Sequence, residues 1–153
     1  MATREEAIAF LEKLREAKPS DSINPFTSKY KGISFVLKYI YKHEGKTYTS
    51  DISKDMHIST ARVSALINKL EDRGFVTRQE SKTDARKTVI VLTKKGANFV
   101  KEMEEALIQS TMHLIDTVGM EDLTQFLRIA NNIKNAMQDY VPFHRKLEDF
   151  FND

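Results

Sequence analysis

The sequence predicts a mainly α-helical fold with one small β-hairpin wing, that is, a winged helix-turn-helix flanked by further helices at both ends. Residues 49–93 contain, in order, a short polar helix, a turn, a second helix and a two-stranded hairpin. Long helical patterns of apolar residues stand before and after this stretch. The length of 153 residues suits one domain, or a subunit that completes its core by pairing. We therefore expect a single domain over residues 1–153, with a winged helix lobe at 28–95 and a helical dimerisation region at 2–17 and 96–151.

Two helices and one strand are predicted ahead of the helix-turn-helix. Residues 2–17 place apolar side chains on one face, and the connector after them contains Pro19 and Pro25. Residues 28–42 are apolar on most sides, which favours a helix at the centre of the fold that Gly45 ends. Lys46–Tyr48 is predicted to be a short third strand that pairs with the wing.

The first helix of the helix-turn-helix is predicted over residues 49–56. Thr49 or Ser50 is expected as its N-cap, with Ile52 and Met56 pointing inward at positions i and i+4. His57-Ile58 then forms the turn that crosses the two helices.

The second helix is expected to begin at the N-cap Ser59 and to end at Gly74, which takes the left-handed conformation common at helix ends. Its apolar residues recur at three- and four-residue steps and form one buried stripe: Val63, Leu66, Ile67 and Leu70. The opposite side carries small, hydroxyl-bearing and basic residues: Thr60, Ala61, Arg62, Ser64, Ala65, Asn68 and Lys69. Such a surface suits a major groove, because small side chains permit close approach and Arg can bond bidentately to guanine.

A hairpin is predicted after Gly74, with β-branched runs at 75–80 and 88–93 around a charged tip. The tip carries Lys82, Arg86 and Lys87, so it can reach along DNA and place an Arg in the minor groove. From Ser59 to Lys95 the chain has nine basic and four acidic residues, whereas the whole chain has a net charge of only +2. Positive charge concentrated on one segment fits a protein that presents one face to phosphates.

The C-terminal half predicts two long helices, at 96–118 and 121–141, separated by Gly119. Their wide apolar faces exceed what a winged domain needs for its own core, so we expect a two-fold dimer. An intramolecular helical subdomain is the alternative. After Pro142, the aromatic residues Phe143, Phe150 and Phe151 predict a tail that docks on its own subunit or across the dimer.

Catalysis is not expected. The chain has no cysteine, which excludes disulfides, cysteine nucleophiles and thiol switches. Its four histidines, His43, His57, His113 and His144, lack metal-ligand spacing, so no metal site is predicted, although His43, Glu44 and His113 are conceivable partners for zinc. Phosphate-binding and dinucleotide-binding glycine patterns are also missing. With neither a signal-like nor a membrane-spanning apolar run, a cytoplasmic location is expected and no membrane partner.

At these residues the sequence resembles the MarR family of bacterial and archaeal transcriptional regulators. The resemblance is strong over residues 49–100. Its matching motifs are Val63-Ser64 with Leu66, the run Leu70-Glu71-Asp72-Arg73-Gly74-Phe75-Val76, the wing Asp84-Ala85-Arg86, and Leu92-Thr93-Lys94-Lys95-Gly96. The resemblance implies that Arg86 enters the minor groove and that Asp84 orients it. It also implies a homodimer and a crevice for an aromatic or anionic effector, for which Phe10, Phe35, Tyr39 and Met112 are plausible walls.

We therefore predict a sequence-specific regulator that binds a pseudo-palindromic site on double-stranded DNA as a dimer, a repressor that a small molecule of unknown identity releases. The predicted DNA-binding residues are Thr49, Ser59, Thr60, Arg62, Ser64, Asn68, Lys69, Lys82, Asp84, Arg86 and Lys87. The predicted dimerisation residues are Ile8, Phe10, Leu11, Phe126, Ile133, Met137, Tyr140 and Phe143. The alternative is a winged-helix module for protein interaction or architectural nucleic-acid binding, without a ligand response.

Overall fold

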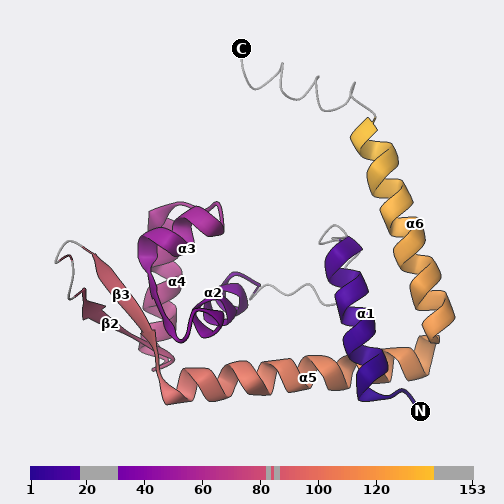
Figure 1. Cartoon of the computed structure of the whole chain (residues 1–153), viewed down its shortest axis with the longest axis horizontal. Helices are drawn as coiled ribbons and strands as arrows, with labels where there is room; N and C mark the ends of the chain where they lie inside the picture. Colours follow the sequence, from indigo (N-terminus) through magenta and orange to yellow (C-terminus); the bar gives the residue numbers. More distant parts are fainter. Residues whose placement is uncertain (18–30, 82–83, 85–86, 140–153) are drawn as a thin grey trace. The chain divides into compact units, whose positions relative to one another are not determined.

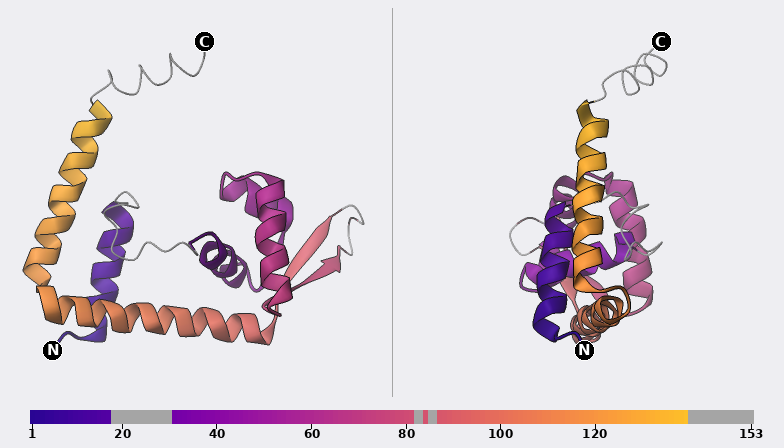
Figure 2. Two further views of the ribbon diagram at one scale, coloured as in Figure 1. Left: turned by 180° about the vertical axis from the view of Figure 1, so that it is seen from behind. Right: turned by 90° about the vertical axis from the view of Figure 1, so that its right-hand side faces the viewer.

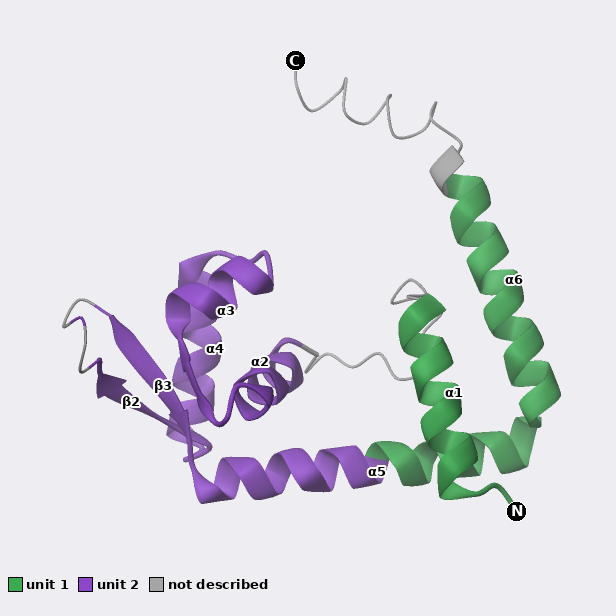
Figure 3. Ribbon diagram, viewed as in Figure 1, with its two compact units in different colours: residues 1–27, 107–153 green, residues 28–106 purple. Residues whose placement is uncertain are grey.

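The computed structural model describes residues 1–17, 31–81, 84 and 87–139. Figure 1 labels the helices and the strands β2 and β3, and Figure 3 colours the two compact units into which the chain divides. Unit 1 consists of residues 1–27 with 107–153, and unit 2 of residues 28–106. Each unit is described by itself.

Unit 2 has the predicted winged helix layout. Its elements are α2 (Lys31–Lys42), β1 (Lys46–Tyr48), α3 (Thr49–Asp55), α4 (Thr60–Asp72), β2 (Val76–Glu80), β3 (Thr88–Leu92) and the first part of α5 (Lys94–Val118). The three strands form an antiparallel sheet in the order β1-β3-β2, in which Ile90 lies opposite Thr47 on one side and Arg78 on the other. The predicted pairing of residues 46–48 with the wing is therefore confirmed.

The core of unit 2 joins the helices to the sheet, and Figure 2 shows the ribbon from two further directions. The predicted apolar stripe of α4 faces this core: Val63, Ile67 and Leu70 are fully buried. Val100 of α5 is also fully buried there, with Phe99 and Met103 packed against the same cluster. Because these turns of α5 belong to the core, unit 2 extends beyond residue 95, where the sequence pattern places the end of the lobe.

The start of α5 is tied to the end of α4 by Thr93 and Gly96. The Thr93 hydroxyl donates to the Gly74 carbonyl at 2.7 Å and accepts from the Gly96 backbone N–H at 3.0 Å, which makes Thr93 the cap of α5. A Cβ atom on Gly96 would stand 2.1 Å from the Phe75 carbonyl oxygen. Close packing therefore explains the glycine in the motif from Leu92 to Gly96, because only glycine admits the backbone of Phe75 at this distance.

Unit 1 contains α1 (Arg4–Ala17), the second part of α5, and α6 (Met120–Asp139), with Gly119 at φ +90° between the last two. Its core brings together Ala7, Phe10 and Leu14 of α1 with Ile115, Leu123 and Leu127. The ammonium of Lys134 on α6 donates to the carbonyl of Ala17 at 3.4 Å, which satisfies one terminal acceptor of α1.

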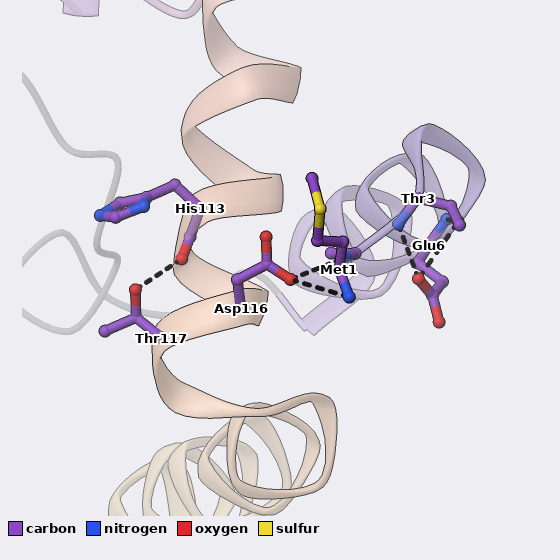
Figure 4. A network of polar contacts seen from close by, with 7 residues as sticks. Met1, Thr3, Glu6, His113, Asp116 and Thr117 are labelled. Carbon is purple, nitrogen blue, oxygen red and sulfur yellow. Dashed lines mark hydrogen bonds and ion pairs between the residues drawn. The ribbon is translucent and has the colours of Figure 1, made fainter.

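Helix α1 begins at Arg4, two residues later than predicted, because a capping box precedes it (Figure 4). The Glu6 carboxylate accepts from the Thr3 backbone N–H at 2.8 Å, and the Thr3 hydroxyl accepts from the Glu6 N–H at 3.2 Å. Figure 4 also shows Asp116 of α5 turned toward the first residues: its carboxylate accepts from the Ala2 N–H and lies 3.8 Å from the Met1 ammonium. The start of α1 is thereby fixed on α5 within unit 1.

Part of the predicted dimerisation surface is exposed on unit 1. The exposed apolar side chains of α1 and α6 are Ile8, Phe126, Ile129, Ile133 and Met137, each between 39% and 52% exposed. Of the other predicted dimerisation residues, Phe10 is 1% exposed and fills the core of its own unit, and Leu11 is half-buried. The helical spacing of α1 places Phe10 on the same face as Leu14, so Phe10 packs in the core beneath the exposed apolar side chains. Tyr140, Phe143 and the aromatic tail lie outside the described residues.

Candidate nucleic-acid interface

The outward face of α4 carries the residues predicted to read DNA. Ser59 is the N-cap, with φ −63° and ψ 151°, and its hydroxyl accepts from the Arg62 backbone N–H at 3.2 Å. Each of the seven residues predicted to face outward is exposed: Thr60, Ala61, Arg62, Ser64, Ala65, Asn68 and Lys69. Helix α4 thus buries its apolar stripe in unit 2 and presents small, polar and basic side chains to solvent.

Ser53 holds the turn between α3 and α4. Its hydroxyl donates to the Ile58 carbonyl at 2.7 Å, and the Ile58 N–H donates to the Ser53 carbonyl at 3.2 Å. His57 between them has φ +51°, a left-handed conformation that costs energy in a non-glycine residue. Two hydrogen bonds on one residue offset this cost and fix the angle at which α4 leaves the turn.

The predicted N-cap of α3 is wrong. The N-cap is Tyr48, in extended conformation and without a side-chain capping bond, and α3 begins at Thr49. The chain passes directly from β1 into α3, because Tyr48 pairs with Val89 in the sheet and leaves no position for a separate cap. Thr49 is consequently half-buried in the first turn, whereas Ser50 is exposed.

A polar cluster joins α2 to the end of α3. The hydroxyl of Tyr39 donates to Asp55 Oδ2 at 2.6 Å, and the His43 ring stacks on the Tyr39 ring with the centroids 4.1 Å apart. Burial raises the pKa of Tyr39 to about 12, and the hydrogen bond to Asp55 and its negative charge act in the same direction. The neutral phenol therefore remains a donor that holds α3 against α2 throughout the physiological range.

The base of the wing is built on Ser81, which is 8% exposed. Its backbone N–H donates to the Lys87 carbonyl at 3.1 Å, its hydroxyl accepts from the Asp84 N–H at 3.3 Å, and the Lys87 N–H donates to the Asp84 carbonyl at 2.9 Å. The Lys87 ammonium lies 5.4 Å from the centroid of the Tyr48 ring, within the range of a cation–π contact. The predicted wing residues Lys82 and Arg86 lie outside the described residues.

Arg78 of β2 is a site residue that the sequence reasoning missed. Its guanidinium donates to the Glu71 carboxylate in a short ion pair and to Asn68 Oδ1 at 2.5 Å, and its backbone N–H donates to Glu71 Oε1 at 3.3 Å. Asn68 and Glu71 stand at i and i+3 on α4, so one side chain reaches both. The sequence motif that contains Glu71 predicts the end of the helix, but nothing in the neighbouring residues predicts a contact between Glu71 and a strand residue.

The described residues also allow a search for an effector cavity and for metal ligands. A cavity of about 250 Å³ in unit 1 is lined by Asp122 and by apolar side chains that include Phe10, Leu114 and Phe126. Of the other suggested walls, Phe35 is 54% exposed and Tyr39 is engaged with Asp55. Among residues 1–17, 31–81, 84 and 87–139, no three His, Asp or Glu side chains gather as metal ligands. Within the same residues, no helix combines the length and apolar character needed to cross a membrane.

Sequence comparison places the winged region among known regulators. The model of the MarR family matches residues 34–88. The HTH-type transcriptional regulator YwhA of Bacillus subtilis (strain 168) is 30% identical over 95 residues, which are 62% of this chain and 68% of that protein. The matches to two further HTH-type regulators of that organism cover 65% and 63% of their lengths, so the chain spans about two thirds of these relatives.

Solved structures agree on the fold. The heme sensor protein PefR from Streptococcus agalactiae, in complex with heme, is similar with a TM-score of 0.61 and 20% identity, over 87% of this chain and 92% of that one. FabT from Streptococcus pneumoniae, in complex with DNA, gives a TM-score of 0.55 and 20% identity, over 85% of this chain and 87% of that one. Each alignment covers more of the chain than the winged helix lobe alone.

Proposed function

The chain belongs to the MarR family of winged helix-turn-helix transcriptional regulators, and from this premise we propose that it binds a pseudo-palindromic DNA site as a homodimer and represses transcription until a small molecule releases it. The single observation that carries the proposal is the outward face of α4, because it is polar, basic and free of bulk on a helix-turn-helix scaffold.

Two features of this face fit the major groove. Small side chains at its N-terminal half, such as Ala61 and Ser64, permit close approach, while Arg62 is exposed and offers a planar pair of donors to guanine. Ser59 accepts a backbone N–H at the start of the helix, so the other free amides of this first turn can bond a phosphate. Base reading and backbone anchoring are thereby combined on one short segment.

The wing supplies the second contact. Lys87 is exposed at its base, and Lys82 and Arg86 belong to the same tip in the sequence. In the family pattern Arg86 enters the minor groove and Asp84 orients it. Positive charge on the segment 59–95 adds sequence-independent attraction to phosphates, which strengthens as salt is lowered.

The exposed apolar stripe of α6 supports the dimer. Phe126, Ile129, Ile133 and Met137 recur at three- and four-residue steps, and each is 42% to 52% exposed. A row of large apolar side chains on one helix face costs free energy in water, and a second copy covers it most simply. Dimerisation then sets the distance between the two α4 helices, and about 34–36 Å is required to enter successive major grooves.

A response to an effector follows from the spacing of the two α4 helices in the dimer. A small molecule that favours another spacing of the two α4 helices lowers DNA affinity, and by linkage DNA lowers the affinity for the molecule by the same factor. The relative PefR binds heme and the relative FabT binds DNA, which supports both halves of the proposal in this fold.

The test is selection of bound duplexes from a random pool, followed by affinity measurements over a range of salt. We expect a pseudo-palindrome with half-sites one helical turn apart, bound with a steep salt dependence and a clear preference over unrelated DNA. Weak, salt-sensitive binding without enrichment of any sequence would instead indicate the architectural or protein-binding module.

A further inference from the structure

Beside the apolar core that they share, α4 and β2 are joined by a polar contact centred on Arg78. Arg78 lies in the middle of β2, opposite Ile90 of the central strand, and its guanidinium reaches back to α4. There it bonds Glu71 and Asn68 at once, while its own backbone N–H bonds the same Glu71 carboxylate. We call these three residues the α4–β2 brace.

Glu71 stands on a helix whose outward face carries Arg62, Asn68 and Lys69 and in a segment with a net charge of +5. An acidic side chain near a surface that meets phosphates weakens binding by simple electrostatics. The carboxylate of Glu71 can nevertheless aid DNA binding if it holds Arg78, and with it β2, in the position that DNA binding requires. Arg78 donates two hydrogen bonds to this carboxylate, one from its guanidinium and one from its backbone N–H.

The bonding pattern suits a positioning role. The guanidinium is a planar fork, so simultaneous bonds to Glu71 and Asn68 fix its plane as well as its place. The additional backbone bond from Arg78 to Glu71 fixes the strand itself. Rotation of β2 about its junction with α4 breaks all three bonds together.

We propose that Arg78 is a positioning residue for DNA recognition, and that the α4–β2 brace sets the angle at which the wing meets the minor groove while α4 occupies the major groove. This inference rests on the proposed function and deepens it. Asn68 becomes part of the reading geometry through its amide oxygen, in addition to any contact that its amide N–H groups make with DNA.

The alternative role of Arg78 is a plain phosphate contact, and the two roles predict opposite effects at Glu71. A phosphate contact is improved or unchanged when the negative charge beside it is removed. A positioning residue is impaired, because the brace is lost. Glu71→Gln therefore separates the two, and Arg78→Lys separates them again, because lysine keeps the charge but not the planar fork.

The experiment measures affinity for the selected duplex and for unrelated DNA, with salt dependence, on wild type, Glu71→Gln, Arg78→Lys, Arg78→Gln and the double variant Glu71→Gln/Arg78→Lys. Glu80→Gln and Arg73→Gln serve as charge-matched controls, since each removes the same charge from an exposed neighbour with no bond to the brace. Unchanged melting temperature and dimerisation establish that each variant is folded.

We expect Glu71→Gln and Arg78→Lys each to weaken binding to the selected duplex about fivefold and to lower its preference over unrelated DNA, because each disrupts half-exposed charge-assisted bonds. The double variant is no weaker than the weaker single variant, as coupled residues require. The salt dependence of Arg78→Lys stays that of wild type.

A phosphate contact at Arg78 would give a different set of results and would overturn the inference. Glu71→Gln would then bind as tightly as Glu80→Gln, and Arg78→Lys would have the affinity of wild type. Arg78→Gln would lower the slope of the salt dependence by about one unit. If the variants match wild type on a duplex that wild type prefers, this inference alone fails. If wild type prefers no sequence, the proposed function fails and the brace loses its role with it.

Discussion

Alanine at Gly96 is expected to destabilise unit 2 strongly, although alanine favours helices. The added Cβ would lie 2.1 Å from the Phe75 carbonyl oxygen and 2.8 Å from a methyl carbon of Leu92. Ordinary contact needs more than about 3.2 Å, so the strand after Phe75 has to move by roughly 1 Å. Overpacking of this kind costs about 1–3 kcal/mol.

The displaced carbonyl adds to this cost. The Phe75 oxygen accepts from the Thr93 N–H at 3.0 Å and lies 3.1 Å from the Thr93 hydroxyl. Loss of one such bond costs about 1 kcal/mol. We expect a total near 3 kcal/mol and a fall of more than about 10 °C in the melting temperature of unit 2.

Gly32→Ala is the matched control. A Cβ at this helical glycine meets only Leu66 methyl carbons at 3.5 and 3.6 Å, which is ordinary contact. Alanine there is expected to be neutral or to stabilise by up to about 1 kcal/mol. Urea unfolding followed by circular dichroism compares the two, and amide exchange in α4 and β3 locates the loss in unit 2. A Gly96→Ala chain as stable as the Gly32→Ala chain would refute the packing argument.

Three further predictions concern the interface and the polar cluster behind it. Arg62→Ala should change base preference at one position of each half-site, by about 1–3 kcal/mol if the contact is bidentate; an equal loss on every sequence would identify a phosphate contact instead. Arg86→Ala should weaken binding and relax any preference for a narrow A·T minor groove, and wild-type affinity would show that the wing assignment is wrong. Tyr39→Phe should destabilise the protein by about 1 kcal/mol at neutral pH through loss of the bond to Asp55. Because the folded-state pKa of Tyr39 is raised to about 12, the stability that its neutral phenol contributes is complete below pH 10 and is lost between pH 10 and about 12. The Tyr39→Phe chain should therefore lose less stability over this range than wild type, and parallel stability curves would contradict the pKa shift.

Local chemistry was sufficient to predict the helix-turn-helix and the hairpin. The N-cap of α4 at Ser59, its end at Gly74 and its buried stripe all depend on neighbours within a few residues, and the structure confirms each. The third strand was also predictable, because residues 46–48 stand between two helices with no length for anything longer.

Errors and omissions arose where distant segments compete. Thr49 is a good N-cap by residue type, but strand pairing of Tyr48 with Val89 moves the cap one position earlier. The pattern of α1 alone also does not show that Leu123 and Leu127 enclose Phe10 in the core of unit 1. Such contacts join residues far apart in the chain, and periodicity within one helix cannot assign them.

Arg78 was missed for a related reason. Along β2 it is one exposed basic residue among polar neighbours, and its role appears only when Glu71 and Asn68 of α4 are brought to it.

The most direct test of the central claim is the spacing of the two half-sites. Insertion of five base pairs at the centre of the selected duplex turns one half-site to the opposite face of the DNA, and insertion of ten restores the face but doubles the distance. If two α4 helices of one dimer read successive major grooves, both insertions should reduce affinity to that of a single half-site. Affinity that is indifferent to both insertions would show that each copy reads DNA alone, and the dimeric account would be wrong.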